Sequence, residues 1–223
     1  MDIRQLMDCS HRPNITQREL YRVILRSCCN ATGEMILTNQ NTKLGQKIHY
    51  ETNQKLFKTV DKKLHSMLPN ALPWSKGLLG RCAVVGSGGI LQNSSSYGNA
   101  SLLLSPFSYQ FCTGLSLDVY HVLRPLRPNQ KVVFFNPNFL LQLSRKWKGR
   151  GLKEPRLTSG LMLASVHLYG FWPFPLDLYH NPLPHHYYDN VGPKKGVHSM
   201  PDEFLLMLQL HTQGVLQLHL GRC

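Results

Sequence analysis

Residues 81–89 read Arg81-Cys-Ala-Val-Val-Gly-Ser-Gly-Gly89, and this stretch decides the fold that we expect. The short apolar run is typical of a strand buried on both faces, and the glycines after it predict a tight turn. Because glycine carries no side chain, the N–H groups of such a turn can approach a phosphate closely. The stretch therefore predicts one strand of a layered α/β sheet that ends at a candidate anion-binding turn.

Helical and strand patterns alternate on both sides of this stretch. Thr16 stands where the N-cap of a first helix is expected, and Pro201 fits the first turn of the last helix. The expected helices cover residues 16–29, 115–123, 138–147 and 201–213, with a further helix start at 159, and the expected strands cover 81–85, 102–104, 131–135, 167–171 and 215–220. Strands that alternate with helices predict an α/β protein.

The chain is strongly basic. It has 25 Lys and Arg against 12 Asp and Glu, which gives a formal net charge of +13. Such a balance favours anionic partners, for example nucleic acids, lipid headgroups, nucleotide sugars or acidic glycans. A nucleic-acid-binding protein would add a recognisable module, and the sequence has no zinc-finger spacing, RNP aromatic pattern or basic zipper. We therefore expect no nucleic-acid partner.

Cysteines and glycosylation patterns bear on the cell compartment and on metal binding. The six cysteines include no CxxC pair, so we expect neither a metal site nor a thioredoxin-like redox motif. Four N-glycosylation acceptor patterns begin at Asn14, Asn30, Asn93 and Asn99, and together they favour a lumenal protein. No apolar run long enough for a signal peptide or a membrane span follows Met1. We expect membrane association only through an anchor that is absent from this chain.

The glycine turn and the histidines carry little weight when each is taken alone. The pattern Gly86-x-Gly-Gly differs from the dinucleotide fingerprint GxGxxG, and no acidic residue stands downstream to bind a ribose. A tight turn without a ligand is the common explanation of such glycines. Each of the eleven histidines, taken singly, is more often a surface or structural residue than a catalytic one.

Four motifs in a fixed order give a stronger signal. They read Cys82-Ala-Val-Val-Gly-Ser-Gly-Gly-Ile-Leu-Gln-Asn93, then Arg156-Leu-Thr-Ser-Gly160 with Leu168-Tyr-Gly-Phe-Trp-Pro-Phe174, then His185-His-Tyr-Tyr-Asp189, and finally His198-Ser-Met-Pro-Asp-Glu203. In this order they resemble the large, small, third and very small sialylmotifs of the animal sialyltransferases. The resemblance runs from about Cys28 onward. The second and third strings and the C-terminal cysteine point to the alpha-2,8 branch, and most of all to its ganglioside-type members.

The resemblance implies a fold, an activity and a location. It implies a single-domain, Rossmann-like layered sheet of the GT-A-like sialyltransferase type, with a stem-like and helical extension over residues 1–74 and the catalytic domain over residues 75–223. The implied reaction is an inverting, metal-independent and cofactor-free transfer of sialic acid from CMP-sialic acid. The acceptor would be a sialylated glycolipid or glycoprotein, and the new linkage alpha-2,8. Family members are type II membrane proteins of the Golgi lumen.

The resemblance also assigns residues to roles. His198 is the candidate base for the acceptor hydroxyl, since a neutral imidazole can accept a proton near neutral pH. His186 would stabilise the phosphate of the departing CMP, together with hydroxyl and backbone N–H groups of residues 158–160. The residues expected to bind the donor are Gly86, Ser87, Gly88, Asn93, Thr158, Ser159, Gly160, Phe171 and Trp172, and those expected to support the site are Glu203, His185 and Tyr187.

The resemblance breaks at two places. After Asn93 the large motif of the family continues through several dozen residues, including a central strand and helix, that this chain lacks. A second, shorter gap precedes His167, and Ser87 replaces the usual asparagine. We therefore expect an incomplete sheet and a donor pocket that is open on one side.

The cysteines change as well. In the family, disulfides join the large motif to the small motif and to the C-terminus, whereas Cys82 and Cys223 lack these partners here. The loss of a native disulfide costs about 2–5 kcal/mol, which is comparable with the stability of a whole domain. Two functions follow: a sialyltransferase whose activity is weakened or lost, or an inactive shortened isoform that acts at most as a lumenal binding protein.

Overall fold

The computed structural model describes residues 11–30, 33–73, 83–85, 101–149, 151–152, 158, 167–169, 171–186, 190–192 and 200–220. The chain divides into two compact units. The first contains Met1–Ile24, Arg81–Ser96 and Trp147–Cys223, and the second contains Leu25–Gly80 and Tyr97–Lys146. Parallel strands and helices occur in both units, so the expected α/β class is confirmed.

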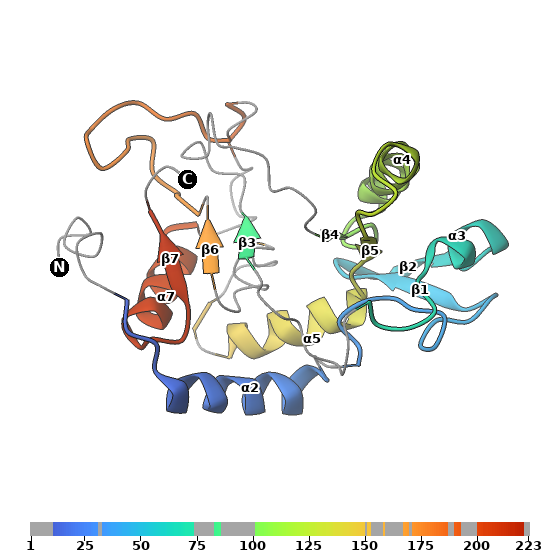
Figure 1. Ribbon diagram of the computed structural model, residues 1–223, viewed down its shortest axis with the longest axis horizontal. Helices are drawn as coiled ribbons and strands as arrows, with labels where there is room; N and C mark the ends of the chain where they lie inside the picture. Colours follow the sequence, from blue (N-terminus) through green and yellow to red (C-terminus); the bar gives the residue numbers. More distant parts are fainter. Residues whose placement is uncertain are drawn as a thin grey trace. The chain divides into compact units, whose positions relative to one another are not determined.

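The first unit contains a three-stranded parallel sheet in the order β3–β6–β7. The central strand β6 (His167–Tyr169) pairs with β3 (Ala83–Val85) on one side and with β7 (Gln217–His219) on the other (Figure 1). Neighbouring parallel strands need a crossover, and α7 (Met200–Thr212) lies in the one that leads into β7. These strands and this helix fall where the sequence predicted them.

A tight turn between α7 and β7 depends on Gly214. Its φ of +70° is a left-handed conformation that favours glycine, and its N–H donates to the carbonyl oxygen of His211 at 2.9 Å. The carbonyl oxygen of Gly214 in turn accepts from the backbone N–H of Asn14 at 3.0 Å. A Cβ at position 214 would lie only 2.6 Å from the carbonyl oxygen of Arg12 and from the nitrogen of Asn14. Only glycine fits between the N-terminal segment and this turn.

The helix α2 (Ile15–Cys29) is capped by a residue other than the one that the sequence predicted. The side-chain Oδ1 of Asn14 accepts the backbone N–H of Gln17 at 3.0 Å, which is the geometry of an N-cap. Thr16 lies inside the first turn instead. The prediction of Thr16 was therefore wrong, because the N-cap lies two residues earlier, at Asn14, and the helix begins at Ile15.

Side chains from the part of α2 that belongs to the first unit, Ile15–Ile24, contact other residues of that unit. The Nε of Arg18 donates to the carbonyl oxygens of Gly214 and Val215, both at 3.1 Å. The ring of Tyr21 stacks on that of Trp147, with the centroids 6.3 Å apart. The apolar spacing of residues 16–29 predicts that Leu20 and Val23 face inward, but both are exposed, so this prediction was wrong.

The second unit contains a parallel pair of strands joined by a helix. β4 (Leu102–Leu104) pairs with β5 (Val132–Phe134), and α4 (Gln110–Leu126) connects them. Both strands agree with the sequence prediction. The helix is longer than the expected 115–123 and includes Pro125 in its last turn.

The sequence did not predict the antiparallel hairpin and short helix of this unit. β1 (Lys47–Tyr50) pairs with β2 (Asn53–Thr59), and α3 (Lys62–Met67) follows. Asp61 caps α3 by accepting the N–H of Leu64 at 2.7 Å. The segment is polar because β2 is exposed along most of its length, and so it lacks the apolar run on which a strand prediction depends.

Aromatic and aliphatic side chains from all parts of the second unit form its core. The buried members are Leu37, Ile48, Tyr50, Val60, Leu64, Met67, Leu68, Phe107, Tyr120 and Phe134. A bridge between Ile36 and Phe135 extends the strand pairing beyond β5. The helix α5 (Pro137–Lys148) buries Phe139, Leu140 and Leu143, as its spacing predicted.

The single layered sheet that we expected is represented, among the described residues, by two separate parallel sheets. The described cysteines comprise a bonded pair, Cys28 and Cys29, and the free thiol of Cys112. Cys82 and Cys223 lie outside the described residues, as does the helix start at 159. None of the described helices is both long and apolar enough to cross a membrane.

The N-cap of α2 can be tested directly. Replacing Asn14 with alanine, in protein made without glycans, should lower the free energy of unfolding by about 0.5–2 kcal/mol because the Gln17 N–H loses its acceptor. Thr16→Ala is the matched control and should change the free energy by less than about 0.5 kcal/mol. Urea denaturation measures both values. A larger loss for Thr16→Ala than for Asn14→Ala would contradict this assignment.

The surroundings of His211 predict that the stability of the first unit depends on pH. Its Nδ1 accepts the backbone N–H of Leu218 at 3.2 Å, and its ring stacks on His11 with the centroids 5.0 Å apart. Burial lowers the pKa of His211 below 6.5, although a backbone hydrogen bond with Leu216 acts in the opposite direction. The nearby guanidinium of Arg18, 3.4 Å from His11 Nε2, adds a further positive charge to this cluster.

We expect the stability of the protein to fall as the pH drops below about 6.5. The unfolded chain protonates His211 near its ordinary pKa and the folded chain only at lower pH, so between the two values the unfolded state binds more protons. His211→Gln should reduce this dependence, and the same change at the exposed His121 should not. Urea denaturation at pH 7.5, 6.5 and 5.5 gives the free energy of unfolding of each variant. If this free energy falls equally with decreasing pH in His211→Gln and in the wild type, His211 is not the cause of the pH dependence.

Candidate functional site

The structure describes six of the predicted site residues: Thr158, Phe171, Trp172, His185, His186 and Glu203. The others lie outside the described residues, namely Gly86, Ser87, Gly88, Asn93, Ser159, Gly160, Tyr187 and His198. The expected meeting of the glycine turn with His198 therefore stays a prediction. All six described residues belong to the first unit, which allows their geometry to be compared.

A buried carboxylate joins the small and the very small motifs. Glu203 is 1% exposed and lies in the first turn of α7. Its carboxylate accepts the backbone N–H of Thr158, at 2.9 Å from Oε2 and 3.1 Å from Oε1, and it also accepts the hydroxyl of Thr158. The helix N-terminus favours a negative charge at this position. The sequence predicted a supporting role for Glu203, and this contact shows that it anchors residue 158.

An edge-to-face cluster of aromatic rings follows directly from this anchor. Phe204, the next residue of α7, contacts both Trp172 and Phe174, with ring centroids 5.7 and 5.6 Å apart. Trp172 and Phe174 contact each other at 5.3 Å. Trp172 also donates its indole N–H to the carbonyl oxygen of Leu176 at 2.8 Å. The cluster fixes the orientation of the indole, because two aromatic rings contact it and its N–H has an acceptor.

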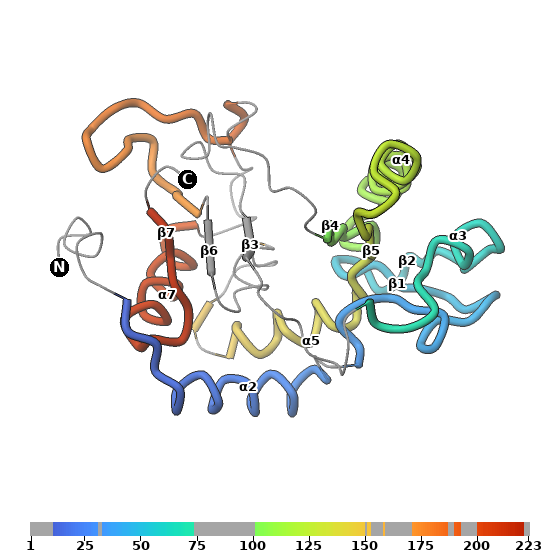
Figure 2. The backbone as a smooth tube through the Cα atoms, in the orientation of Figure 1, coloured from blue at the N-terminus to red at the C-terminus, as the bar shows by residue number. Residues whose placement is uncertain are grey.

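The chain after Trp172 runs out and back in a loop that Figure 2 traces in orange. The carboxylate of Asp177 shapes the tip, where Oδ1 accepts the N–H groups of Tyr179 and Asn181, both at 2.8 Å. His180 adopts a left-handed conformation with a φ of 65°. The N–H of Leu183 then closes the loop on the carbonyl oxygen of Pro175 at 2.8 Å.

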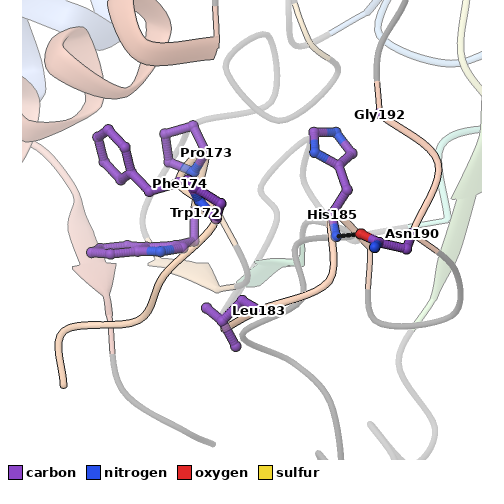
Figure 3. Close-up of a pocket in the computed structure, with 8 residues that line it drawn as sticks. Trp172, Pro173, Phe174, Leu183, His185, Asn190 and Gly192 are labelled. Carbon is purple, nitrogen blue, oxygen red and sulfur yellow. Dashed lines mark hydrogen bonds between the residues drawn. The ribbon is translucent and has the colours of Figure 1, made fainter. Parts of the chain in front are cut away.

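This loop places the small motif and the third motif on two sides of one pocket (Figure 3). The pocket has a volume of about 270 Å³. Trp172, Phe174 and the neighbouring prolines form an apolar side, while His185 and Asn190 stand opposite. The residues that line it are Trp172, Pro173, Phe174, Pro175, Leu183, His185, Asn190 and Gly192.

A hydrogen bond between a side chain and the backbone joins the two polar residues of the pocket. Asn190 Oδ1 accepts the N–H of His185 at 2.9 Å, and the rings of His185 and His186 meet edge to face at 4.7 Å. The imidazole of His185 and the amide of Asn190 opposite an aromatic wall can bind a polar ring, because the wall covers its apolar face while the polar groups donate or accept hydrogen bonds. Phe171 is buried and does not line the pocket, so its predicted contact with a donor remains untested.

Some of these residues were absent from the sequence prediction. Phe204 could have been predicted from the sequence, since it is a large apolar residue next to Glu203 in the expected helix, and such residues are usually buried. Leu183 and Asn190 gave none, because their position depends on the closure of the loop by Asp177 and Pro175.

The Glu203 contact makes a testable prediction. Glu203→Gln replaces one acceptor oxygen with an NH₂ group that faces a donor, so we expect the free energy of unfolding to fall by about 1–3 kcal/mol. Glu19→Gln changes an exposed carboxylate in α2 in the same way and should cost less than about 0.5 kcal/mol. Thermal and urea denaturation provide the two measurements. Equal, small effects would show that the carboxylate does not hold Thr158.

Comparison with known proteins agrees with this arrangement of motifs. The family model of glycosyltransferase family 29 (sialyltransferase) matches residues 30–100 and 95–215. Mouse alpha-2,8-sialyltransferase 8F is 32% identical over an alignment that covers 99% of this chain and 73% of the mouse protein. Human alpha-2,8-sialyltransferase 8E is 30% identical, with 99% and 77% covered. The alpha-N-acetylneuraminide alpha-2,8-sialyltransferase of Xenopus tropicalis is 32% identical, with 95% and 81% covered.

The same comparisons bear on the predicted gap. The two segments of the family match meet at residues 95–100, where the sequence predicted the break. The alignment with the mouse protein has 289 positions and the chain has 223 residues, so at least 66 positions have no residue here. A crystal structure of a mammalian sialyltransferase is 18% identical with a TM-score of 0.47, and the match covers 87% of this chain and 92% of that one. On the evidence of the family match and of these relatives, the chain belongs to glycosyltransferase family 29, the sialyltransferases.

Proposed function

We propose that the chain transfers sialic acid from CMP-sialic acid onto a glycan that ends in sialic acid, with an alpha-2,8 linkage. Family membership and the alpha-2,8-sialyltransferases among the relatives support this proposal. Two observations together bring three of the four motifs into one place. The hydrogen bond between Glu203 and Thr158 joins the very small motif to the small motif, and the pocket of Trp172 and His185 joins the small motif to the third.

In the proposed reaction the acceptor hydroxyl attacks the anomeric carbon from the face opposite to CMP. His198 takes the proton of that hydroxyl while the bond to the CMP phosphate breaks, and the anomeric configuration inverts. His186 and the hydrogen-bond donors of residues 158–160 stabilise the departing phosphate. Glu203 acts through Thr158 and is a positioning residue. No step needs a metal ion or a cofactor.

The proposal includes a setting. The donor would be a nucleotide sugar and the acceptor a sialylated glycolipid or glycoprotein, both in the lumen of the Golgi. The basic surface of the chain, with a net charge of +13, is suited to such anionic substrates.

A second candidate is an inactive family member that binds a ligand or a lumenal partner without turnover. The observation that favours it is the break in the family match, with at least 66 alignment positions unoccupied in this chain. If those positions complete the donor site in the relatives, this chain would retain the loop and its pocket but lose the ability to hold the whole nucleotide.

An activity assay with a matched variant separates the two. We expect the wild-type chain to label a sialylated acceptor from radioactive CMP-sialic acid, and His198→Ala to reduce the rate by about 10²-fold or more. His180→Ala, on the exposed tip of the loop, is the control and should retain the rate. If the wild type and His198→Ala form product at the same rate, His198 is not the base of the reaction.

The absence of product from every variant would leave the second candidate, and ligand binding then tests it. Titration with CMP should raise the melting temperature of the wild type, because a ligand that binds only the folded state stabilises it. Trp172→Leu should reduce the CMP-induced rise, while Tyr179→Ala, which lies outside the pocket, should not. No CMP-induced rise in an inactive wild type would exclude a formed nucleotide site, and of the second candidate it would leave only the binding of a lumenal partner.

A further inference from the structure

We propose that the outer face of the β1–β2 hairpin is a second binding site, which takes a glycan that carries the carboxylates of sialic acid. Four exposed residues form this site, which we call the hairpin cluster: Lys47 and His49 on β1, and Lys55 and Phe57 on β2. All four belong to the second unit, in which β1, β2 and α3 follow one another (Figure 1). The pocket of Trp172 is built from residues of the first unit, so the two sites share no side chain.

The hairpin cluster stands on strands whose other face is anchored in the core. Exposed and buried residues alternate along β1, because successive side chains of a strand point to opposite faces. Ile48 and Tyr50 belong to the core of the second unit, and the hydroxyl of Tyr50 shares a hydrogen bond of 3.0 Å with Thr113. Lys47 and His49 lie on the opposite, exposed face. The cluster is therefore presented from a fixed support.

Contacts between the two strands orient the side chains of the hairpin cluster. His49 pairs with Phe57, and the centroids of their rings are 5.7 Å apart. The ammonium of Lys47 lies 4.3 Å from the centroid of the Phe57 ring, which is a cation–π contact. His49 Nδ1 donates to the carbonyl oxygen of Gln54 at 2.8 Å, so Nε2 is the ring nitrogen that can contact a ligand. Because these groups are already oriented, a ligand pays less to order them.

The charge of this segment is positive and largely uncompensated. From the first residue of β1 to the second residue of α3 there are five lysines and two carboxylates, which gives a formal charge of +3. Glu51 is 5% exposed and Asp61 caps α3, so both carboxylates serve the fold. In the part of the second unit that the structure describes, the only ion pair joins Asp61 to the lysine three residues before it, at 3.8 Å. Lys47 and Lys55 therefore attract an anionic ligand.

The combination of lysines with one exposed aromatic ring favours a sugar over a lipid surface. Leu56 and Phe57 are 40% and 44% exposed, and a lysine stands on each side of this pair in β2. Two apolar side chains among lysines do not form the broad apolar face by which a segment lies in a membrane surface. They suit an acidic sugar, whose C–H groups can cover the ring while its carboxylate accepts charge-assisted hydrogen bonds from the lysines.

The choice of sialic acid as the acidic sugar rests on the proposed function, in which the acceptor ends in sialic acid. The positive charge and the geometry of the hairpin cluster do not depend on that function. Binding at this second site would retain a sialylated acceptor on the protein and so raise its local concentration.

Binding of a fluorescent, alpha-2,8-linked oligosialic acid to the full chain tests the proposal. Anisotropy is measured without CMP-sialic acid, so that no transfer occurs. Lys47→Gln/Lys55→Gln should weaken binding by about tenfold, because charge-assisted hydrogen bonds are lost, and Lys47→Arg/Lys55→Arg should retain it. Phe57→Leu should weaken binding by about two- to fivefold, because the cation–π contact is lost. Arg145→Gln/Lys146→Gln is the matched control, since it removes the same charge from two exposed side chains of α5 and should change the affinity by less than about twofold.

Several results would overturn the proposal. A wild-type chain that does not bind the oligosaccharide has no such site, and equal weakening by the two glutamine pairs would show that net charge alone is responsible. Loss of binding in Trp172→Leu would place the glycan in the pocket instead. Binding to vesicles of anionic phospholipid, without binding to the oligosaccharide, would identify a membrane as the occupant.

The transfer assay keeps this inference distinct from the proposed function. A chain that binds the oligosaccharide through the hairpin cluster but forms no product supports the second site and contradicts the proposed reaction. A chain that forms product but tolerates Lys47→Gln/Lys55→Gln in the binding assay supports the reaction and contradicts the second site.

Discussion

The first unit depends on the buried carboxylate of Glu203. A charged group that is 1% exposed is costly to bury unless hydrogen bonds replace its water, and Thr158 supplies them from its backbone and its hydroxyl. This requirement couples residues 45 positions apart and orients the start of α7. Phe204, the next residue, therefore lies in the aromatic cluster. This cluster orients the indole of Trp172, which lines the pocket. The candidate site is thus a consequence of satisfying one carboxylate.

Regular elements with apolar patterns were predictable from the sequence. The strands at 83–85, 102–104 and 132–134 and the helices α5 and α7 lie where short apolar runs or a 3.6-residue spacing placed them. Such patterns report burial, and burial is what forms these elements. Glu203 and His185 were also named in advance, through motifs whose order carries information that single residues do not.

Features that depend on closure in space were not predictable. The hairpin of β1 and β2 has a mostly exposed second strand, so no apolar run marks it. The N-cap of α2 is Asn14 and not Thr16, and the apolar spacing of a helix does not indicate which of two neighbouring polar residues accepts the N–H of Gln17. Asn190 lies at the pocket because of the shape of the preceding loop, which the hydrogen bonds of Asp177 determine. The sequence of such a loop has no periodicity from which its shape could be predicted. The meeting of His198 with the glycine turn remains a prediction of the motif order alone.

The cap at Asn14 has a consequence for modification by sugars. Asn14 opens an Asn-x-Thr acceptor pattern, and its side chain lies on the exposed surface. Capping uses the amide oxygen, whereas an N-linked sugar is attached through the amide nitrogen. An oligosaccharide could therefore be carried at the very start of the helix without releasing the bond that begins it.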